Sequence, residues 1–253
     1  DRIPLKPRAP AGGPDSDGAS EGSKGLRRII RAVIFDLDGV LVDTAKPAHM
    51  AANAALRGFG KPELSFEDFM RRAWGRYSGD IFKDLVGDLG DEAAKEAMEL
   101  YNRMRWEFIG EAGLYPWTLR ILEALKARGL RLAITTHTVP GLAEGILERF
   151  GIAKYFDAVV RGGEAPRPKP SPDPILLACE RIGVGPEEAV YVGDNVVDVL
   201  AGKAAGCITV ALTTSRGRGE FEEAGADFIL DRLDGLPALI DGLGEGAIGG
   251  SQG

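Results

Sequence analysis

The chain has 253 residues, of which 44% are apolar and 27% are charged, a composition typical of a globular protein with a sizeable hydrophobic core. Its net charge of −7 disfavours nucleic acid as a main partner, because the phosphate backbone attracts basic surfaces. No apolar stretch reaches the roughly 18 residues of a membrane span, and the N-terminus lacks the apolar centre of a signal peptide.

The first expected elements are a disordered tail and a buried strand. Residues 1–28 are rich in Pro, Gly, Ser and charge, which predicts disorder. The apolar run that follows predicts a strand over 30–36, short enough to be buried on both faces of a parallel sheet. It stops at Asp36, Asp38 follows, and Gly39 permits a sharp turn. Ligands bind beyond the carboxyl ends of such strands, although two Asp residues are also common turn formers.

The next segment, from 45 to 112, has a different pattern. Its apolar residues recur at helical spacing, with no strand-like run. Ser65 is expected to cap one helix, 78–86 to form another, and 91–109 to form a long one. The sequence therefore predicts an all-helical insertion over 45–112.

Strand and helix patterns alternate again from residue 113. Strands are predicted over 130–134, 157–160, 189–192, 208–212 and 228–230, and helices over 119–127, 139–150, 173–182 and 196–205. Repeating β-α units with short connections predict an α/β fold, a parallel sheet with helices on both faces. The core would comprise 29–44 and 113–242, and the glycine-rich segment 243–253 is expected to fray.

The chain has two cysteines, Cys179 and Cys207, and no Cys-x-x-Cys pair. Both lie in apolar segments, where a cysteine usually serves as a small buried hydrophobe. This cysteine usage fits a reducing compartment, so a cytoplasmic location is expected.

Polar side chains follow several of the predicted strands or lie in a proline-rich loop. They are Asp36 with Asp38, Thr136, Lys169, and Asp194 with Asp198. Taken singly, each has a structural role as a turn former, a solvated lysine, a helix cap or an exposed helix acid. Parallel strands bring their carboxyl ends to one edge of the sheet, so these positions are expected to converge on a site.

The segments Asp-Leu-Asp-Gly-Val, Lys-Pro-Ser-Pro-Asp and Gly-Asp-x-x-x-Asp, together with a strand-end Thr, occur in a characteristic order between residues 30 and 240. This set resembles the motifs of the haloacid dehalogenase-like hydrolase superfamily, and more closely its phosphoglycolate phosphatase and β-phosphoglucomutase-like branch. The resemblance implies a Rossmann-like parallel sheet core with an inserted all-helical cap domain, which agrees with the helical pattern over 45–112.

The resemblance also implies a Mg²⁺-dependent phosphatase that hydrolyses a small, phosphoglycolate-like metabolite through an aspartyl-phosphate intermediate. Asp36 would be the nucleophile. Asp38 would donate a proton to the leaving group and later take one from the hydrolytic water. The Asp36 carboxylate, the Asp38 carbonyl and Asp194 would hold the metal, because Mg²⁺ prefers oxygen ligands.

The remaining motif residues would stabilise the phosphoryl group, whose oxygens repel an incoming anion. By the resemblance, Lys169 would be a point charge on these oxygens and the Thr136 hydroxyl a donor to them. Asp198, four residues after Asp194, is expected one helical turn away, where it would orient Lys169 or a metal-bound water.

Two positions bear on substrate choice. His137 stands where Asn is frequent in the family, so it either contacts the phosphate or caps the following helix. The segment Gly-Arg-Tyr-Ser-Gly over 75–79 resembles the specificity loop of the cap, where Arg76 would grip a substrate carboxylate or a second anionic group, or would pair locally. Thr135 precedes Thr136, and the second of these threonines is the preferred phosphate donor.

Other activities use the same core residues. A β-phosphoglucomutase-like phosphosugar mutase is one alternative, although His49 lies one residue further from Thr44 than in those relatives and is interpreted as a polar residue of a cap helix. Lys46 and Lys61 leave open a Schiff-base lysine, as in phosphonate-cleaving relatives. A silent phosphometabolite-binding module is another alternative. Dehalogenation is disfavoured, because the dehalogenases of the family lack the second acid that Asp38 supplies. The expected partner is a small phosphorylated metabolite, with no nucleic acid and no membrane, and the protein is expected to be a monomer or homodimer.

Overall fold

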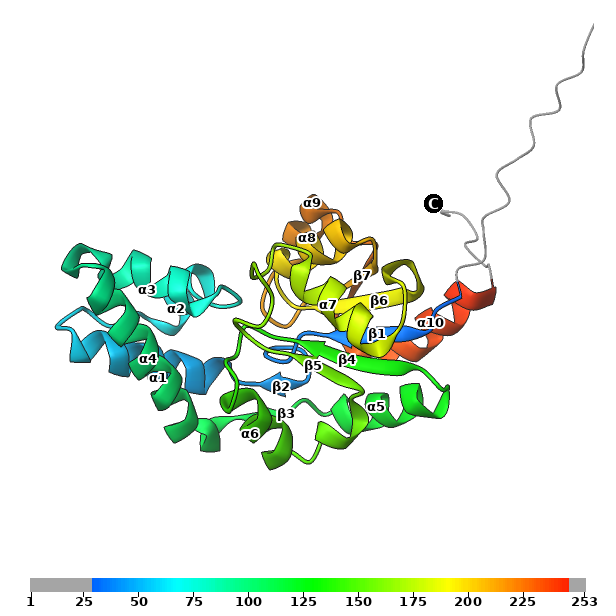
Figure 1. Ribbon diagram of the computed structural model, residues 1–253, viewed down its shortest axis with the longest axis horizontal. Helices are drawn as coiled ribbons and strands as arrows, with labels where there is room; N and C mark the ends of the chain where they lie inside the picture. The colour runs from blue at the N-terminus through cyan, green and yellow to red at the C-terminus, as the bar shows by residue number, and fades with distance from the viewer. Residues whose placement is uncertain (1–28, 246–253) are drawn as a thin grey trace, which may run out of the picture.

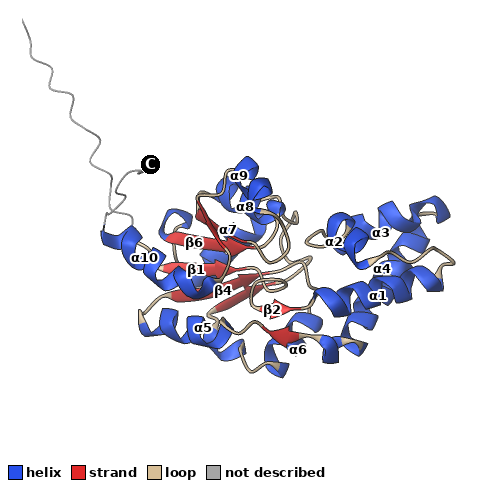
Figure 2. Ribbon diagram, turned by 180° about the vertical axis from the view of Figure 1, so that it is seen from behind, coloured by secondary structure: helices blue, strands red, loops and turns tan. Residues whose placement is uncertain are grey.

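The computed structural model describes residues 29–245 of the chain. The tail predicted over 1–28 lies outside the described residues, as does segment 246–253 of the predicted frayed end. Figures 1 and 2 show a sheet with helices on both faces and, beside it, a separate group of helices. No helix between residues 29 and 245 has the length and apolarity that crossing a membrane requires.

The core is a six-stranded parallel sheet with the order β5-β4-β1-β6-β7-β8. Its strands are β1 (Ala32–Phe35), β4 (Arg131–Thr135), β5 (Ala158–Val160), β6 (Ala189–Gly193), β7 (Ile208–Leu212) and β8 (Phe228–Leu230). Every neighbouring pair is parallel, so the predicted Rossmann-like α/β class is confirmed. From β1 the chain proceeds to β4 and β5 on one side and returns to β6 on the other. The connections from the neighbouring strands β1 and β6 therefore run in opposite directions, which makes this pair the topological switch point of the sheet. Ligands bind beyond the carboxyl ends of the strands at such a point.

Alternating side chains of β1 contact two helical layers, because successive residues of a strand face opposite sides. Val33 and Phe35 pack with α5 (Thr118–Ala127), α6 (Leu142–Arg149) and α10 (Leu236–Glu245). Ala32 and Ile34 pack with α7 (Asp173–Ile182) and α8 (Val196–Ala205) on the other face. Figure 1 shows α7 and α8 above the sheet and α5 below it. Cys179 and Cys207 are buried in the second layer, as hydrophobes would be.

The second group of helices, here called the helical region, comprises α1 (Ala45–Gly58), α2 (Phe66–Arg72), α3 (Ser78–Val86) and α4 (Asp91–Glu107). It has a hydrophobic cluster of its own, in which alanines of α1 and α4 are buried and let the two helices approach closely. Ser65 caps α2 by accepting a hydrogen bond from the Asp68 amide, as the sequence predicts. A short antiparallel ribbon, β2 (Val42–Asp43) with β3 (Gly113–Leu114), lies where the chain enters and leaves this region.

Sequence patterns do not predict two of the helices in the structure. Phe221 anchors α9 (Arg218–Ala224), and Leu236 and Ile240 anchor α10 in the core, so tertiary burial outweighs the low helix propensity of their glycines. Because α10 runs to Glu245, the core extends past 242, and residues 243–245 are helical where fraying was expected.

Candidate active site

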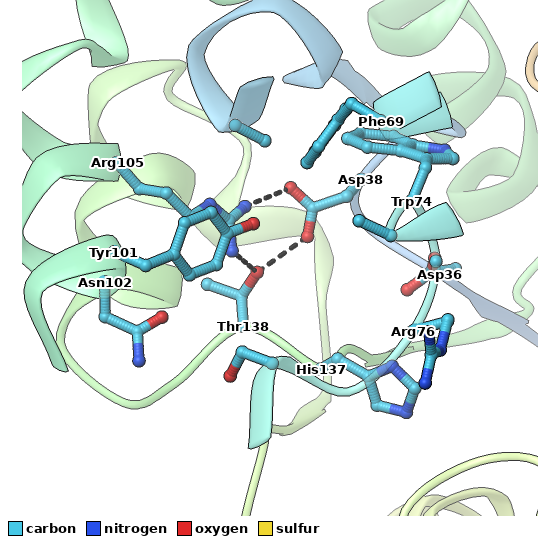
Figure 3. A pocket seen from close by; sticks show the side chains of 14 residues that line it. Asp36, Asp38, Phe69, Trp74, Arg76, Tyr101, Asn102, Arg105, His137 and Thr138 are labelled. Carbon is cyan, nitrogen blue, oxygen red and sulfur yellow. Dashed lines mark hydrogen bonds and ion pairs between the residues drawn. The ribbon is translucent and has the colours of Figure 1, made fainter. Parts of the chain in front are cut away.

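A pocket lies between the carboxyl edge of the sheet and the helical region (Figure 3). The core contributes Asp36, Asp38, His137 and Thr138 to its walls, and the helical region contributes Trp74, Arg76, Tyr101, Asn102 and Arg105, among others. The cavity measures about 50 Å³. A water molecule needs roughly 10–15 Å³ by a comparable measure, so in this arrangement the pocket has room for a small group only.

Three carboxylates converge at the switch point of the sheet. Asp36 directly follows β1, Asp194 follows β6, and Asp198 lies in the first turn of α8. Each offers an oxygen within 4.8 Å of the others, and all three side chains are buried. Gly39 allows this approach, because a Cβ at that position would lie 2.1 Å from Asp194 Oδ2 and its φ of 84° favours glycine.

The carboxylates of this cluster are not equivalent. Asp198 Oδ1 accepts hydrogen bonds from Lys169 and Tyr191, and its Oδ2 accepts one from the Asn195 amide. Asp194 Oδ2 accepts a bond of 3.0 Å from Trp74 Nε1 of the helical region. Its Oδ1 is buried and has no hydrogen-bond partner among residues 29–245. A buried oxygen without a partner is costly, and a carboxylate oxygen is the kind of ligand that a cation such as Mg²⁺ prefers, so this atom could hold one.

Burial and like charges change the acidity of the cluster. Burial, followed by the charge of Asp198, raises the pKa of Asp194 to about 7. Burial also raises the pKa of Asp36 well above its usual value, although Lys169 opposes the effect. Carboxyl groups this close repel one another unless a cation or a proton intervenes, so the arrangement fits a divalent metal.

Lys169, in the proline-rich loop before α7, is buried beside the carboxylate cluster. Its Nζ lies 3.1 Å from Asp36 Oδ1 and donates to Asp198 Oδ1 at 2.7 Å and to the Tyr191 hydroxyl at 3.2 Å. Burial alone would lower its pKa, but Asp198 and Asp36 hold the pKa well above its usual value, so the side chain stays charged. Neither Lys169 nor Asp198 is the solvated residue that its local sequence suggests.

Tyr191 is a residue of the site that sequence reasoning missed. Its hydroxyl joins Lys169, Asp198 and Thr135, with a distance of 2.9 Å to Thr135 Oγ1. Thr135 is therefore turned toward Tyr191, whereas Thr136 Oγ1 lies 3.2 Å from Asp38 Oδ2. A tyrosine within the otherwise apolar β6 was the available signal, because a buried hydroxyl requires a partner.

Asp38 is held by a dense set of donors. Its Oδ1 accepts from Thr44 at 2.5 Å and from Arg105 at 2.7 Å. Its Oδ2 accepts from Thr138 at 2.7 Å, in addition to Thr136. Burial would raise the pKa of Asp38, but Arg105 and the hydroxyl groups lower it below its usual value.

Arg105 is the second residue that sequence reasoning missed. It occupies the buried stripe of α4 formed by positions 94, 97, 101 and 105, and it also donates to Thr138 Oγ1 at 2.9 Å. A guanidinium on the buried face of an otherwise amphipathic helix was the signal, because buried charges require partners.

The two residues expected to bear on substrate choice, His137 and Arg76, line the pocket but have different surroundings. His137 Nε2 is buried without a partner among the described residues, and burial, followed by the charge of Lys169, lowers the pKa of His137 to about 4. The alternative that His137 caps the next helix is wrong, because Gly141 is the N-cap of α6. Arg76 pairs locally, with Asp84 at 2.6 Å and with the Arg72 carbonyl at 2.9 Å.

Three other residues considered for alternative activities do not line this pocket. His49 Nε2 lies 2.8 Å from the Leu64 carbonyl within the helical region, so it is a polar residue of α1. Lys46 and Lys61 form exposed contacts with Glu111 and Asp88.

The raised pKa of Asp194 predicts a pH-dependent stability in metal-free buffer. Between about pH 4 and pH 7 the Asp194 carboxyl group is protonated to a greater extent in the folded protein than in the unfolded chain, so its contribution to stability falls as pH rises through this window. Between pH 4.5 and 7.5 the free energy of unfolding of the wild type is expected to fall by roughly 1–3 kcal/mol relative to that of Asp194→Asn. Urea denaturation of both proteins with a chelator measures this difference, and parallel pH profiles would contradict it.

The protein resembles known hydrolases over most of its length. A family model described as haloacid dehalogenase-like hydrolase matches residues 30–206. The phosphoglycolate phosphatase of Escherichia coli O157:H7 is 34% identical over 233 residues, covering 83% of this chain and 92% of the relative. A solved structure described as a predicted phosphoglycolate phosphatase from Haemophilus somnus superposes with a TM-score of 0.71 at 28% identity, covering 83% of this chain and 97% of the other. The solved structure of a haloacid dehalogenase-like family protein from Streptococcus pneumoniae superposes with a TM-score of 0.72 at 26% identity, covering 83% of this chain and 98% of the other.

Proposed function

The chain belongs to the haloacid dehalogenase-like hydrolases, and on that premise we propose that this phosphatase depends on Mg²⁺ and hydrolyses a small phosphoglycolate-like metabolite through an aspartyl-phosphate on Asp36. The observation that carries the proposal is the convergence of Asp36, Asp194 and Lys169 at the switch point of the sheet. A nucleophile, an open oxygen for a cation and a fixed ammonium group are the parts that phosphoryl transfer requires.

The residues that would hold the metal are Asp36, the Asp38 carbonyl, and Asp194 through Oδ1, which has no hydrogen-bond partner within residues 29–245. When bound, Mg²⁺ supplies the positive charge that lets an anionic carboxylate approach the phosphorus atom. Asp36 attacks phosphorus, a new bond forms between them, and the ester bond to the leaving oxygen breaks. Lys169 and the Thr136 hydroxyl stabilise the charge on the phosphoryl oxygens.

Asp38 acts as a general acid toward the leaving group in the first step and as a general base toward water in the second. In the ligand-free site Asp38 is ionised, so it takes up a proton from solvent as the substrate enters. It gives this proton to the departing oxygen, then takes a proton from the water that hydrolyses the aspartyl-phosphate. Thr44, Thr136 and Thr138 fix the orientation of its carboxyl group by their hydrogen bonds. This orientation keeps the acid on the leaving-group side of Asp36.

The helical region acts as a cap over 45–112 that selects the substrate. The Trp74 indole reaches across to Asp194, and the Asn195 side chain donates to the Trp74 carbonyl at 3.1 Å, so the two parts are linked beside the carboxylate cluster. Closure of such a cap excludes water from the reacting groups. The cavity of about 50 Å³ favours a metabolite with only a few atoms beyond its phosphate.

Phosphate release from a panel of phosphorylated metabolites tests the proposal. The purified protein is expected to hydrolyse phosphoglycolate with Mg²⁺, to lose activity in excess chelator and to regain it when Mg²⁺ is restored. Transfer of the phosphoryl group to a sugar hydroxyl instead of water would indicate a mutase. Thermal stabilisation by phosphometabolites without any turnover would indicate a binding module.

A further inference from the structure

Arg105 differs from the other arginines of the protein in its surroundings. It is the only arginine between residues 29 and 245 that is buried, with 8% of its surface exposed. Figure 3 shows its side chain extending from α4 into the pocket toward Asp38 and Thr138. The guanidinium carbon lies 5.8 Å from the centre of the Tyr101 ring.

This placement is unfavourable for stability alone. Removing a guanidinium from water is costly, and an apolar side chain in the buried stripe of α4 would pack without that cost. The charge therefore needs a role at the pocket. Its two hydrogen bonds to protein side chains, to Asp38 and Thr138, use two of the five N–H donors of a guanidinium, so donors remain for a ligand.

We propose that Arg105 is a specificity-determining residue that binds a carboxylate on the leaving group, so that the protein prefers short acids phosphorylated close to their carboxylate over phosphate esters without one. The proposal rests on the phosphatase function proposed above. The planar guanidinium matches a carboxylate in a bidentate geometry, and the substrate carboxylate takes the place that Asp38 Oδ1 occupies in the ligand-free pocket. One carboxylate replaces another at Arg105, which keeps the buried charge paired.

Distances limit the substrate to a short acid. The leaving oxygen must lie about 2.6–3.2 Å from the carboxyl group of Asp38 to receive its proton. Arg105 Nη2 lies 2.7 Å from Asp38 Oδ1. A substrate carboxylate in the place of Asp38 Oδ1 therefore lies within the width of one carboxyl group plus one hydrogen-bond length, about 6 Å, of the leaving oxygen. An acid phosphorylated on the carbon next to its carboxylate meets this condition, whereas a sugar acid phosphorylated at its far end does not.

Arg76 is less suited to this role. Its guanidinium already pairs with Asp84 and the Arg72 carbonyl, and its side chain is 38% exposed. An exposed ion pair contributes little, because water and salt screen it. Arg105 instead contacts Asp38 within the pocket at 2.7 Å, and its side chain is 10% exposed, so its charge is little screened by water.

The test compares phosphoglycolate with phosphoglycolamide, whose neutral amide has nearly the size of the carboxylate. Wild-type protein is expected to prefer phosphoglycolate by about 10- to 100-fold in kcat/KM, as for a charge-assisted hydrogen bond. In Arg105→Gln this preference is expected to disappear, mainly through a higher KM for phosphoglycolate, and Arg105→Lys is expected to restore part of it. Arg103→Gln, an exposed position on the same helix, is the matched control and is expected to keep the preference.

Two results would overturn the inference. One is equal use of the two compounds by the wild type, which decides the matter even if Arg105→Gln fails to fold. The other is an unchanged preference in folded Arg105→Gln. In both cases the protein still releases phosphate, so the phosphatase function stands. Absence of phosphate release from either compound by the wild type would instead overturn the proposed function, and this inference with it.

Discussion

Replacement of Asp36 by asparagine is expected to abolish phosphate release while the protein remains folded. The amide is a far weaker nucleophile than a carboxylate and forms no aspartyl-phosphate. Loss of a covalent nucleophile lowers kcat by roughly 10⁴- to 10⁶-fold. The same change removes one of three buried carboxylates, and Lys169 keeps its bond of 2.7 Å to Asp198. The metal-free free energy of unfolding is therefore expected to be no lower than in the wild type.

The measurement pairs single-turnover phosphate release with urea denaturation monitored by circular dichroism. Asp80→Asn, an exposed position in α3, is the matched control and is expected to keep both activity and stability. Turnover within tenfold of the wild type in Asp36→Asn would refute the assigned nucleophile. A drop in activity together with unfolding would show that Asp36 serves the structure instead.

Replacement of Lys169 by methionine is expected to remove activity and also to destabilise the protein by about 3–5 kcal/mol in metal-free buffer. Lys169 is the cation that lies between the carboxylates of Asp36 and Asp198, at 3.1 and 2.7 Å. Methionine fills much of its volume but leaves these carboxylates buried without a counter-charge. In catalysis the variant also loses the positive charge that stabilises the phosphoryl oxygens.

A double-mutant cycle separates the two effects of Lys169. Adding Asp198→Asn to Lys169→Met removes one uncompensated charge, so the double variant is expected to recover part of the lost free energy of unfolding but none of the activity. Mg²⁺ is expected to raise the melting temperature of Lys169→Met more than that of the wild type, because a cation offsets the missing charge. Lys83→Met, at an exposed position, is the control. Equal stability of Lys169→Met and this control would contradict the expectation.

The local sequence determined the sheet and much of the candidate site. The apolar run that ends at Asp36 predicts a buried strand with a carboxylate at its carboxyl end, because strand burial depends on neighbouring residues in the chain. The order of the Asp36, Lys169 and Asp194 motifs then predicts which strand ends converge, since parallel β-α units have few possible topologies. The helical pattern after Thr44 likewise follows from spacing alone.

Only the tertiary structure decided how Arg105, Tyr191 and Trp74 contact the site. Arg105 reaches Asp38 only because α4 packs against α1 with its charged position turned toward the sheet. Trp74 meets Asp194 across 120 residues of sequence. Such contacts depend on the relative placement of elements that are distant in the chain, and no periodicity or turn signal encodes that placement. The glycine-rich α10 is a further case, because burial of Leu236 and Ile240 outweighed its local preference.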